Sequence, residues 1–422
     1  MSVTTINAWP WTSVGGLFSH WLFLRLTVIL LGMFVGSAAL ALAQVPSSVP
    51  TVVAEEDMQP FTVETLADGL DFPWALAFLP NGDVLITERT GKVRLMEDGA
   101  LRPAPLANTP EPFVGGQGGY FDILSDPGFS ENRLVYLALA VGTQKQSSTQ
   151  IVRARLGEDG FSDVTPLFTS TPRATSAHYG GKLLFLPDGT LVLTLGDGYQ
   201  ERERAQGLGN TLGKIIRIKT DGSIPGDNPF GGRGDAVNPA IYTYGHRSPQ
   251  GLVRDPKTGT VYMHEHGPQG GDEINIVSPG ANYGWPIATY GIDYSGARIS
   301  PFQSYEGTRQ PIRYWVPSIA PSGFAFYRGS AFPDYDGDLF VGALAGRALH
   351  RVQLDGDRVV GEEVLLKAKG ERIREVRVGP DGMIYVLTDG PDGKLWRLTP
   401  RSSRLSEVPE VLPAAQGHAD AQ

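Results

Sequence analysis

The stretch "LFLPDGTLVLTLGDG" (184–198) carries the pattern that decides the fold. Apolar residues lead into a Pro-Asp-Gly turn, and a run of leucine, valine and threonine follows it. Proline presets one dihedral angle of such a turn, and glycine accepts the positive φ at which the chain reverses. The stretch therefore predicts two antiparallel β-strands joined by a tight turn.

The same unit recurs in "AFLPNGDVLITER" (77–89), "ILSDPGFSENRLVYLALAV" (123–141), "LVRDPKTGTVYMHEH" (252–266), "AFPDYDGDLFVGAL" (331–344) and "VGPDGMIYVLTDG" (378–390). The turn prolines of the six units are Pro80, Pro127, Pro187, Pro256, Pro333 and Pro380. With 53 Gly, 32 Pro and almost no sustained helical periodicity, the repeats predict an all-β fold, a six-bladed β-propeller. A β-sandwich is the alternative, but it calls for fewer and more evenly spaced units.

We place the propeller domain at residues 61–400. A strand at 61–67 ("FTVETLA") is expected to join the last blade near 393–400 ("GKLWRLTP") and so close the ring. An exposed lead-in at 44–60, rich in Pro, Ser and acidic residues, precedes the domain, and a polar tail at 401–422 follows it.

The first 43 residues have the pattern of a signal peptide. Arg25 precedes an apolar stretch at 26–42, and small residues at Ala41-Leu42-Ala43 predict cleavage after Ala43. An uncleaved membrane anchor is the alternative, because about 17 apolar residues are only just enough to span a bilayer. Cleavage would give a periplasmic or secreted protein with no stable membrane insertion.

Charge and cysteine content exclude several classes of partner and site. The net charge of −9 offers no attraction to nucleic acids or to anionic bilayers, so we expect no nucleic-acid partner and favour small neutral or mildly polar ligands. The chain has no cysteine, which excludes disulfides, thiolate zinc sites, iron–sulfur clusters and cysteine nucleophiles.

His178 stands beside two glycines, Gly180 and Gly181, just before an apolar strand. Glycines there leave room for a flat ligand or another chain segment to approach closely. A neutral imidazole can take a proton from a hydroxyl group held within hydrogen-bonding distance. On this pattern His178 is either a general base or a structural histidine satisfied by its neighbours.

Five further polar residues stand at predicted strand ends of different repeats: Gln117, Asp197, Arg247, Arg372 and Arg374. Each taken alone reads as a turn amide, a turn cap or a solvated charge. In a propeller, strand ends of the same sense meet on one rim. Amide and cationic donors from separate blades would then surround a single anionic, planar ligand.

Two metal sites are conceivable around residue 266. Strand alternation places His264 and His266 on one face and Glu265 on the other, which suits zinc, although the sequence singles out no further ligands. Carbonyl oxygens at Gly267 and Pro268, beside two acidic residues, suit calcium. An acidic turn without metal remains the alternative reading of that segment.

The longer motifs follow a known order. They are, in chain order, "GLDFPWALAFLPNGDVLITER", "GGQGGYFDI", "HYGGKL", "LGDG", "IYTYGHRSPQGL", "HGPQGGDEIN", "NYGWP" and "WVPSIAPSG". This series resembles the motifs of the soluble quinoprotein sugar dehydrogenases, and especially of the bacterial aldose sugar dehydrogenases. The resemblance runs from about residue 61 to residue 400.

The resemblance implies a six-bladed propeller that binds pyrroloquinoline quinone (PQQ) and calcium and oxidises the C1 hydroxyl of aldose sugars to lactones. His178 would be the general base, and hydride would pass to the quinone. The implied cofactor contacts are Arg247 at the quinone oxygens, Gln117, Asp197 and Ser248 as positioning groups, Arg372 and Arg374 on the carboxylates, and the carbonyls of Gly267 and Pro268 on calcium. Electrons would leave to a separate acceptor.

Three positions depart from the pattern of the glucose-oxidising relatives. Ala177 stands where those relatives have an acid before the base histidine, and Ser248 stands where they have Asn. A lysine that contacts PQQ in those relatives falls near Ala345 of this chain, which leaves cofactor binding with one cation fewer. These changes bear on cofactor affinity and sugar preference.

Two other functions stay open. A metal-dependent propeller hydrolase, lactonase-like, would use His264, His266 and Glu265 and need no quinone. A non-catalytic binding propeller would have kept the fold and lost the cofactor.

Overall fold

The structure is a computed structural model that describes residues 49–401. The predicted signal peptide (1–43), the start of the lead-in and the tail beyond residue 401 lie outside the described residues. Within residues 49–401 we find no helix with the length and apolar composition needed to cross a membrane.

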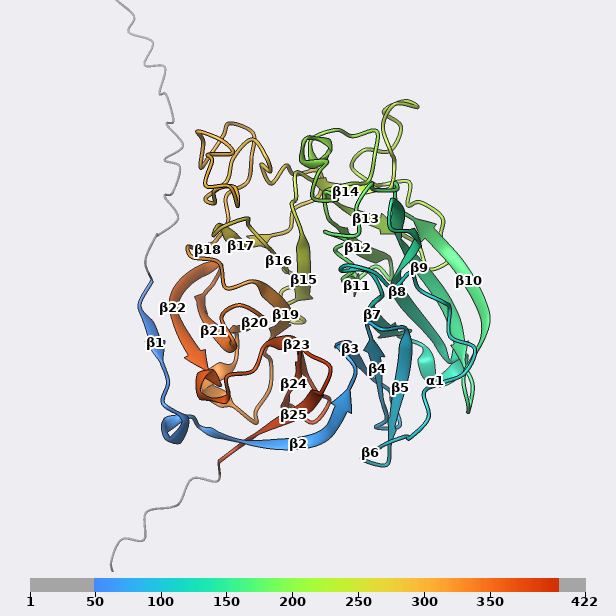
Figure 1. The fold of residues 1–422 in the computed structure, drawn as a ribbon, viewed down its shortest axis with the longest axis vertical. Coiled ribbons are helices and arrows are strands. Elements are labelled where there is room, and N and C mark those ends of the chain that lie inside the picture. Colours follow the sequence, from blue (N-terminus) through green and yellow to red (C-terminus); the bar gives the residue numbers. More distant parts are fainter. Residues whose placement is uncertain (1–48, 402–422) are drawn as a thin grey trace, which may run out of the picture. The chain divides into compact units, whose positions relative to one another are not determined.

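Six sheets are arranged around a common centre, as Figure 1 shows, and all their strand pairs are antiparallel except the outermost pair of the fifth blade. From the innermost strand outward, the first three blades are β3 (Pro73–Phe78), β4 (Val84–Glu88), β5 (Lys92–Glu97) and β6 (Ala100–Leu101); β7 (Tyr120–Ser125), β8 (Leu134–Thr143), β9 (Gln146–Leu156) and β10 (Phe161–Thr169); and β11 (Leu183–Phe185), β12 (Leu191–Leu195), β13 (Lys214–Ile218) and β14 (Ile241–Tyr244).

The other three blades follow the same order. They are β15 (Pro249–Arg254), β16 (Val261–Glu265), β17 (Asp272–Ile276) and β18 (Arg313–Trp315); β19 (Pro321–Phe326), β20 (Leu339–Ala343), β21 (Ala348–Asp355) and β22 (Arg358–Leu365); and β23 (Ile373–Val378), β24 (Ile384–Thr388), β25 (Gly393–Pro400) and β2 (Phe61–Leu70). The helical turns are α1 (Phe129–Asn132), η1 (Glu56–Met58), η2 (Arg202–Ala205), η3 (Pro333–Tyr335) and η4 (Lys367–Lys369).

The ring closes through the sixth blade. β2 runs antiparallel to β25, with Phe61 opposite Pro400 and Leu70 opposite Gly393, so the expected pairing of 61–67 with 393–400 is confirmed. The six innermost strands contact one another in sequence, and β23 contacts β3 to complete the circle. The predicted six-bladed β-propeller is therefore confirmed.

Each of the six turn prolines lies between the first and second strands of its blade. In the third blade, Leu186 donates its backbone N–H to the carbonyl of Thr190, and Gly189 takes the positive φ of +77° that the reversal needs. All six turns share one end of the propeller, which we call the turn rim. At the opposite end, the site rim, first strands begin and second strands end.

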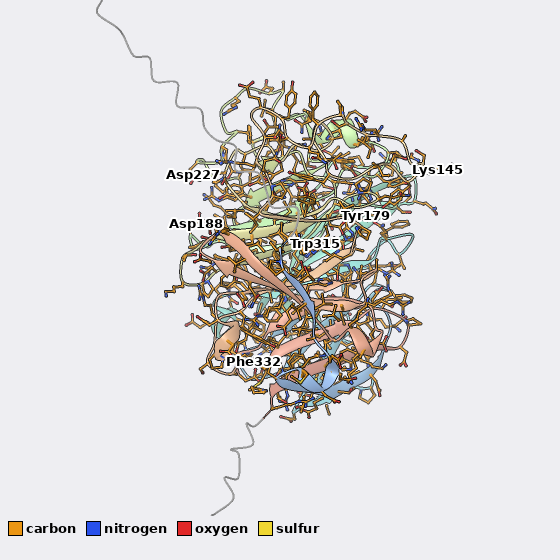
Figure 2. The ribbon with its side chains drawn as sticks, turned by 90° about the vertical axis from the view of Figure 1, so that its left-hand side faces the viewer. Lys145, Tyr179, Asp188, Asp227, Trp315 and Phe332 are labelled. Atoms are coloured by element: carbon orange, nitrogen blue, oxygen red, sulfur yellow. The ribbon has the colours of Figure 1, made fainter. Side chains whose placement is uncertain are left out.

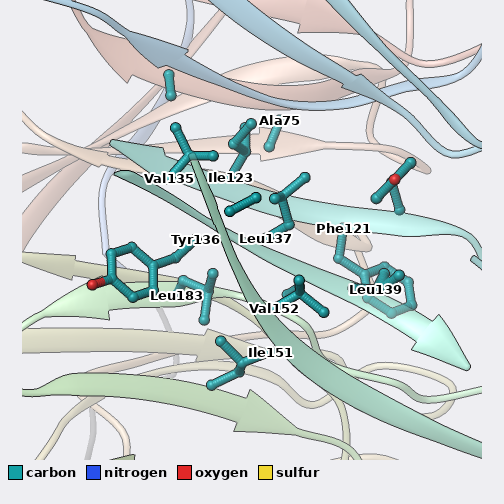
Figure 3. Close-up of a cluster of buried hydrophobic side chains, with 14 of the residues drawn as sticks. Ala75, Phe121, Ile123, Val135, Tyr136, Leu137, Leu139, Ile151, Val152 and Leu183 are labelled. Atoms are coloured by element: carbon teal, nitrogen blue, oxygen red, sulfur yellow. The ribbon is translucent and has the colours of Figure 1, made fainter. Parts of the chain in front are cut away.

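Blades pack face to face through apolar side chains. Figure 3 shows part of the largest cluster, to which Phe121 and Ile123 of β7, Leu137 of β8 and Leu183 of β11 all belong. Charged contacts tie the outer part of the third blade: Asp188 and Asp227, both labelled in Figure 2, share the guanidinium group of Arg217.

The lead-in forms structure of its own. Residues Thr51–Val53 make strand β1, which pairs in parallel with β22 at the outer edge of the fifth blade, with its side chains exposed. Arg401 donates hydrogen bonds to the carbonyl oxygens of Asp57 and Phe61. The two ends of the described chain thus meet at the fifth and sixth blades.

Candidate functional site

The polar residues singled out in the sequence lie on the site rim. Gln117, His178, Arg247 and Arg372 each stand a few residues before the innermost strand of a different blade, and Asp197 follows the second strand of the third blade. Antiparallel pairing places the end of a second strand beside the start of its first strand. The rim therefore gathers side chains from four blades at one end of the ring.

His178 is held rigidly. Its backbone N–H donates to Gln117 Oε1 over 2.7 Å, its carbonyl oxygen accepts from Arg173 Nη1 over 3.1 Å, and its φ of +52° is uncommon for a residue other than glycine. Such a conformation persists only where neighbours impose it, and it is enriched at functional sites. The backbone of His178 is therefore held by Gln117 of another blade and by the nearby Arg173.

Asp197 determines which nitrogen of the His178 ring carries the proton. Its Oδ1 lies 2.7 Å from His178 Nδ1, and because a carboxylate only accepts, Nδ1 carries the proton and Nε2 keeps its lone pair. Among the described residues, Nε2 has no hydrogen-bond partner. Asp197 Oδ2 accepts from Trp285 Nε1 over 2.8 Å, and Oδ1 also accepts from the backbone N–H of Tyr199.

Burial and nearby charges keep His178 neutral and Asp197 ionised, as a general base requires. Burial lowers the pKa of His178, and the nearby Arg247 lowers it further, which together outweigh the raising effect of Asp197. Burial raises the pKa of Asp197, but its hydrogen bond and charge interaction with His178 hold that pKa below its usual value. At neutral pH the imidazole is therefore neutral beside an ionised carboxylate.

Gly180 and Gly181, beside His178, are in close contact with other segments of the chain. A Cβ on Gly180 would lie 2.4 Å from the carbonyl oxygen of Thr194, and one on Gly181 would lie 2.6 Å from Cγ of Phe121. Of the two possibilities raised by the sequence, close approach of another chain segment is the one found. Gly180 also borders the central cavity.

Arg247 links the third and fourth blades. Its Nη1 donates to the carbonyl oxygens of Gly267, at 2.8 Å, and His266, at 3.1 Å, and its guanidinium lies over the ring of Trp285. Asp197 donates its backbone N–H to the carbonyl of Arg247, so Arg247 is connected to the His178–Asp197 pair through both Trp285 and the backbone. The neighbouring Ser248 is buried, and its carbonyl accepts from the N–H of His266.

A cavity of about 570 Å³ opens at the centre of the site rim. Its charged lining is three guanidinium groups, from Arg89, Arg372 and Arg374, against the carboxylate of Asp389, which bonds both Arg372 and Arg374. Its other walls include Gln117, Gln250, His266, Phe72, Trp74, Phe121 and Tyr179. Aromatic walls with two positive charges in excess suit a flat, multiply anionic molecule, which is the chemistry of PQQ.

Comparisons with known proteins agree with this geometry. The sequence profile of the family described as Glucose / Sorbosone dehydrogenase matches residues 70–397. The chain belongs to this family. Aldose sugar dehydrogenase YliI of Escherichia coli (strain K12) is 42% identical over 347 residues, which cover 81% of this chain and 93% of that one.

Solved structures of family members superpose on this chain. The apo form of the soluble aldose sugar dehydrogenase from Escherichia coli has a TM-score of 0.78 at 41% identity and covers 81% of this chain and 100% of its own. The PQQ-bound aldose sugar dehydrogenase from Streptomyces coelicolor has a TM-score of 0.67 at 26% identity and covers 80% and 98%. The predicted family and the prediction of a sugar-oxidising enzyme are confirmed at the level of the family.

The structure shows what surrounds two of the positions that depart from the pattern of the glucose-oxidising relatives, Ala177 and Ala345. Ala177 supplies no carboxylate beside the base, but Asp197 orients His178 from the end of β12. Ala345 is exposed, and the residue before it, Leu344, borders the central cavity. Arg347, in the same turn, donates to the carbonyl of Gly370 and is not part of the cavity lining, so no charged side chain from β20 or from that turn borders the cavity.

Oxygen atoms that could bind a metal ion line a small cavity beside Arg247. The carboxylates of Glu265 and Glu273 border a small cavity of about 10 Å³ together with Gly267 and Gly271, room for about one water molecule or ion. Burial, with the charge of Glu265, raises the pKa of Glu273 to about 8. A hard cation would suit these oxygens, and the Gly267 carbonyl, which accepts from Arg247, keeps a second lone pair.

The zinc arrangement does not form. His264 Nε2 lies 2.8 Å from the carbonyl of Ser322, and Glu265 accepts from the backbone N–H of Arg247 and contacts His246 Nδ1. Among residues 49–401, no three histidine or acidic side chains are placed to hold a metal ion together. The structure therefore gives no support to the hydrolase that would have used His264, His266 and Glu265.

Sequence reasoning missed Arg89, Asp389 and His266 as residues of the cavity wall. Each directly follows the second strand of its blade, as Asp197 nearly does. Aligning the six repeats and reading the residues after each second strand would have found them. His266 also presents a buried Nε2 without a hydrogen-bond partner among the described residues.

Proposed function

We propose that this protein is an exported quinoprotein aldose dehydrogenase that oxidises the C1 hydroxyl of an aldose to the lactone, with PQQ and calcium as cofactors. The observation that carries the proposal is the His178–Asp197 pair, whose free Nε2 stands on the same rim as a polycationic cavity. Export rests on the predicted signal peptide at residues 1–43.

His178 would act as the general base. Its Nε2 takes the proton of the C1 hydroxyl, and Asp197, already ionised, stabilises the imidazolium that forms. When bound, PQQ supplies the two-electron acceptor for the hydrogen on C1. Trp285 and the N–H of Tyr199 hold the Asp197 carboxylate in place, so the proton is received by a ring that does not have to reorient.

The cavity residues would hold the cofactor. Arg372 and Arg374, both hydrogen-bonded to Asp389, would present guanidinium groups to its carboxylates, and Gln117 would contribute an amide. Arg247 faces the region where negative charge develops, close to His178. Calcium would take the carbonyl oxygens of Gly267 and Pro268, of which Gly267 borders the same small cavity as the carboxylates of Glu265 and Glu273.

Electrons would leave to a separate acceptor after each turnover. PQQ accepts two electrons from one sugar, so an acceptor outside this domain must restore the oxidised cofactor before the next sugar reacts. In an assay a redox dye takes this place.

The test is dye-linked oxidation of a panel of aldoses by the protein lacking residues 1–43, with and without PQQ plus calcium. We expect activity only when both are added, and lactone as the product. Activity without PQQ, or a protein that neither turns over nor gains thermal stability with PQQ, would contradict the proposal; the second result would favour the binding propeller.

A further inference from the structure

Arg89 directly follows β4 and lines the central cavity, and the proposed function gives it no role. Its backbone N–H donates to the carbonyl of Phe72 over 2.9 Å, its Nη1 donates to the carbonyl of Gly116 over 3.3 Å, and its guanidinium lies 4.8 Å from the centre of the Phe72 ring. Stacking on an aromatic ring limits the conformations of a long side chain. Arg89 is therefore held in position at the cavity wall.

The charge of Arg89 is not balanced locally. Arg372 and Arg374 share the carboxylate of Asp389, whereas no carboxylate within residues 49–401 forms an ion pair with Arg89. Burial lowers the pKa of Arg374; Asp389 raises it, and Arg89 lowers it again, which places the two guanidinium groups within electrostatic reach of each other. Cations gathered this closely repel one another unless an anion lies between them.

The neighbouring blade is shaped around this arginine. Gly119, with φ of +150°, precedes β7, and a Cβ there would lie 1.9 Å from the carbonyl oxygen of Arg89 and 2.7 Å from its Cγ. Any other residue at 119 would push Arg89 out of its position. Gly119 thus leaves room for the first blade's Arg89 at the rim.

We propose that Arg89 is the third guanidinium of the cofactor site and binds a carboxylate of PQQ from the side of the first blade. It would compensate for the uncharged edge at Leu344 and Ala345. The inference rests on the proposed function for the identity of the ligand. The class of ligand does not depend on that identity: the cavity takes a flat aromatic polycarboxylate, and Arg89 contributes one charge-assisted hydrogen bond to it.

The test compares ligand binding by the wild type, Arg89→Gln, Arg89→Lys and Arg102→Gln. Arg102 belongs to the same blade, pairs with Glu97 and lies outside the cavity lining, so it is the matched control. Dissociation constants are measured by titration, following both intrinsic fluorescence and the rise in melting temperature, with PQQ and with benzene-1,3,5-tricarboxylate as probes.

We expect Arg89→Gln to weaken PQQ binding about tenfold or more, Arg89→Lys to fall between it and the wild type, and Arg102→Gln to bind normally. Equal PQQ affinity of Arg89→Gln and wild type would overturn the inference. Binding of the tricarboxylate but not PQQ by the wild type, lost in Arg89→Gln, would support Arg89 and contradict the proposed function. Binding of neither probe would overturn both.

Discussion

Three buried histidine–carboxylate pairs occur among residues 49–401, and two of them, alike in burial, differ in what else the carboxylate binds. His178 Nδ1 lies 2.7 Å from Asp197 on the site rim, and His350 Nδ1 lies 2.5 Å from Glu362 within the fifth blade. In both pairs the histidine side chain is 8% exposed and the carboxylate 1% exposed. Burial therefore does not distinguish them.

The difference lies in charge compensation. Glu362 also accepts from Arg313, which belongs to β18 of the fourth blade, and from Trp315 Nε1. Burial raises the pKa of Glu362, but its contacts with His350 and Arg313 outweigh this and bring it to about 2. Asp197 accepts from the neutral imidazole of His178, the backbone N–H of Tyr199 and Trp285 Nε1, and none of these donors carries a charge, so the carboxylate remains available to stabilise an imidazolium. The His350–Glu362 pair is linked to the fourth blade through Arg313, whereas we propose that the His178–Asp197 pair accepts the substrate proton.

The largest expected effect comes from His178→Gln. The variant should bind PQQ as the wild type does, because the carboxylate-binding arginines are untouched, and lose a hundredfold to ten-thousandfold in kcat, on the order of what general-base catalysis contributes. Steady-state dye-linked kinetics measure it. His350→Gln is the control: it should keep its turnover, and a loss as large as that of His178→Gln would erase the distinction between the pairs.

Asp197→Asn should lower kcat by on the order of a hundredfold, with little change in melting temperature. The amide would donate to His178 Nδ1, which moves the ring proton to Nε2 and removes the base. The pH profile of kcat/KM checks this: the wild type should keep its activity below the usual histidine pKa, because that of His178 is lowered. A variant with normal kcat and an unchanged profile would show that Asp197 has no role in proton transfer.

Glu362→Gln should destabilise the fold by about 3 kcal/mol, because it leaves the buried Arg313 without its counter-charge. A carboxyl group with a pKa of about 2 in the folded state and 4.5 as its usual value stabilises the folded state above pH 4.5. That contribution is lost as the pH falls toward 2. Denaturant unfolding of wild type and variant at several pH values tests this: the difference between them should shrink in acid, and a difference independent of pH would contradict it.

The smallest effect is expected on the turn rim. Gly189→Ala places a Cβ in open space but at a φ of +77°, so it should cost about 1 kcal/mol of stability and leave kcat unchanged. Chemical denaturation and turnover measured side by side check both parts. A loss of activity there would mean that function is not confined to the site rim.

Much of the fold could be predicted because its signals are local. Pro187 and Gly189 specify a turn by their own dihedral preferences, and six such turns specify the ring. Even the closing strand could be placed, because an unpaired strand at 61–67 needs a partner and the last repeat lacks one. These are properties of short segments repeated in order.

The site could be predicted only in part, because its contacts join distant segments. His178 and Arg247 were found through motifs, but that Asp197 orients His178 depends on side-chain directions across two strands. Arg89 was not singled out, because nothing in "LITER" shows that the ring places it in the lining of the same cavity as Arg374. The glycines at 180 and 181 were ambiguous because sequence does not say which atoms approach them.

The most direct test is a single turnover. Protein loaded with PQQ and calcium is mixed with an aldose in a stopped-flow spectrometer without any electron acceptor, and the absorbance of the bound cofactor is followed. The account predicts one rapid reduction per loaded site in the wild type, and in His178→Gln the same loading but a reduction slower by on the order of a hundredfold or more. Unchanged absorbance in the wild type, or equal rates in both proteins, would contradict it.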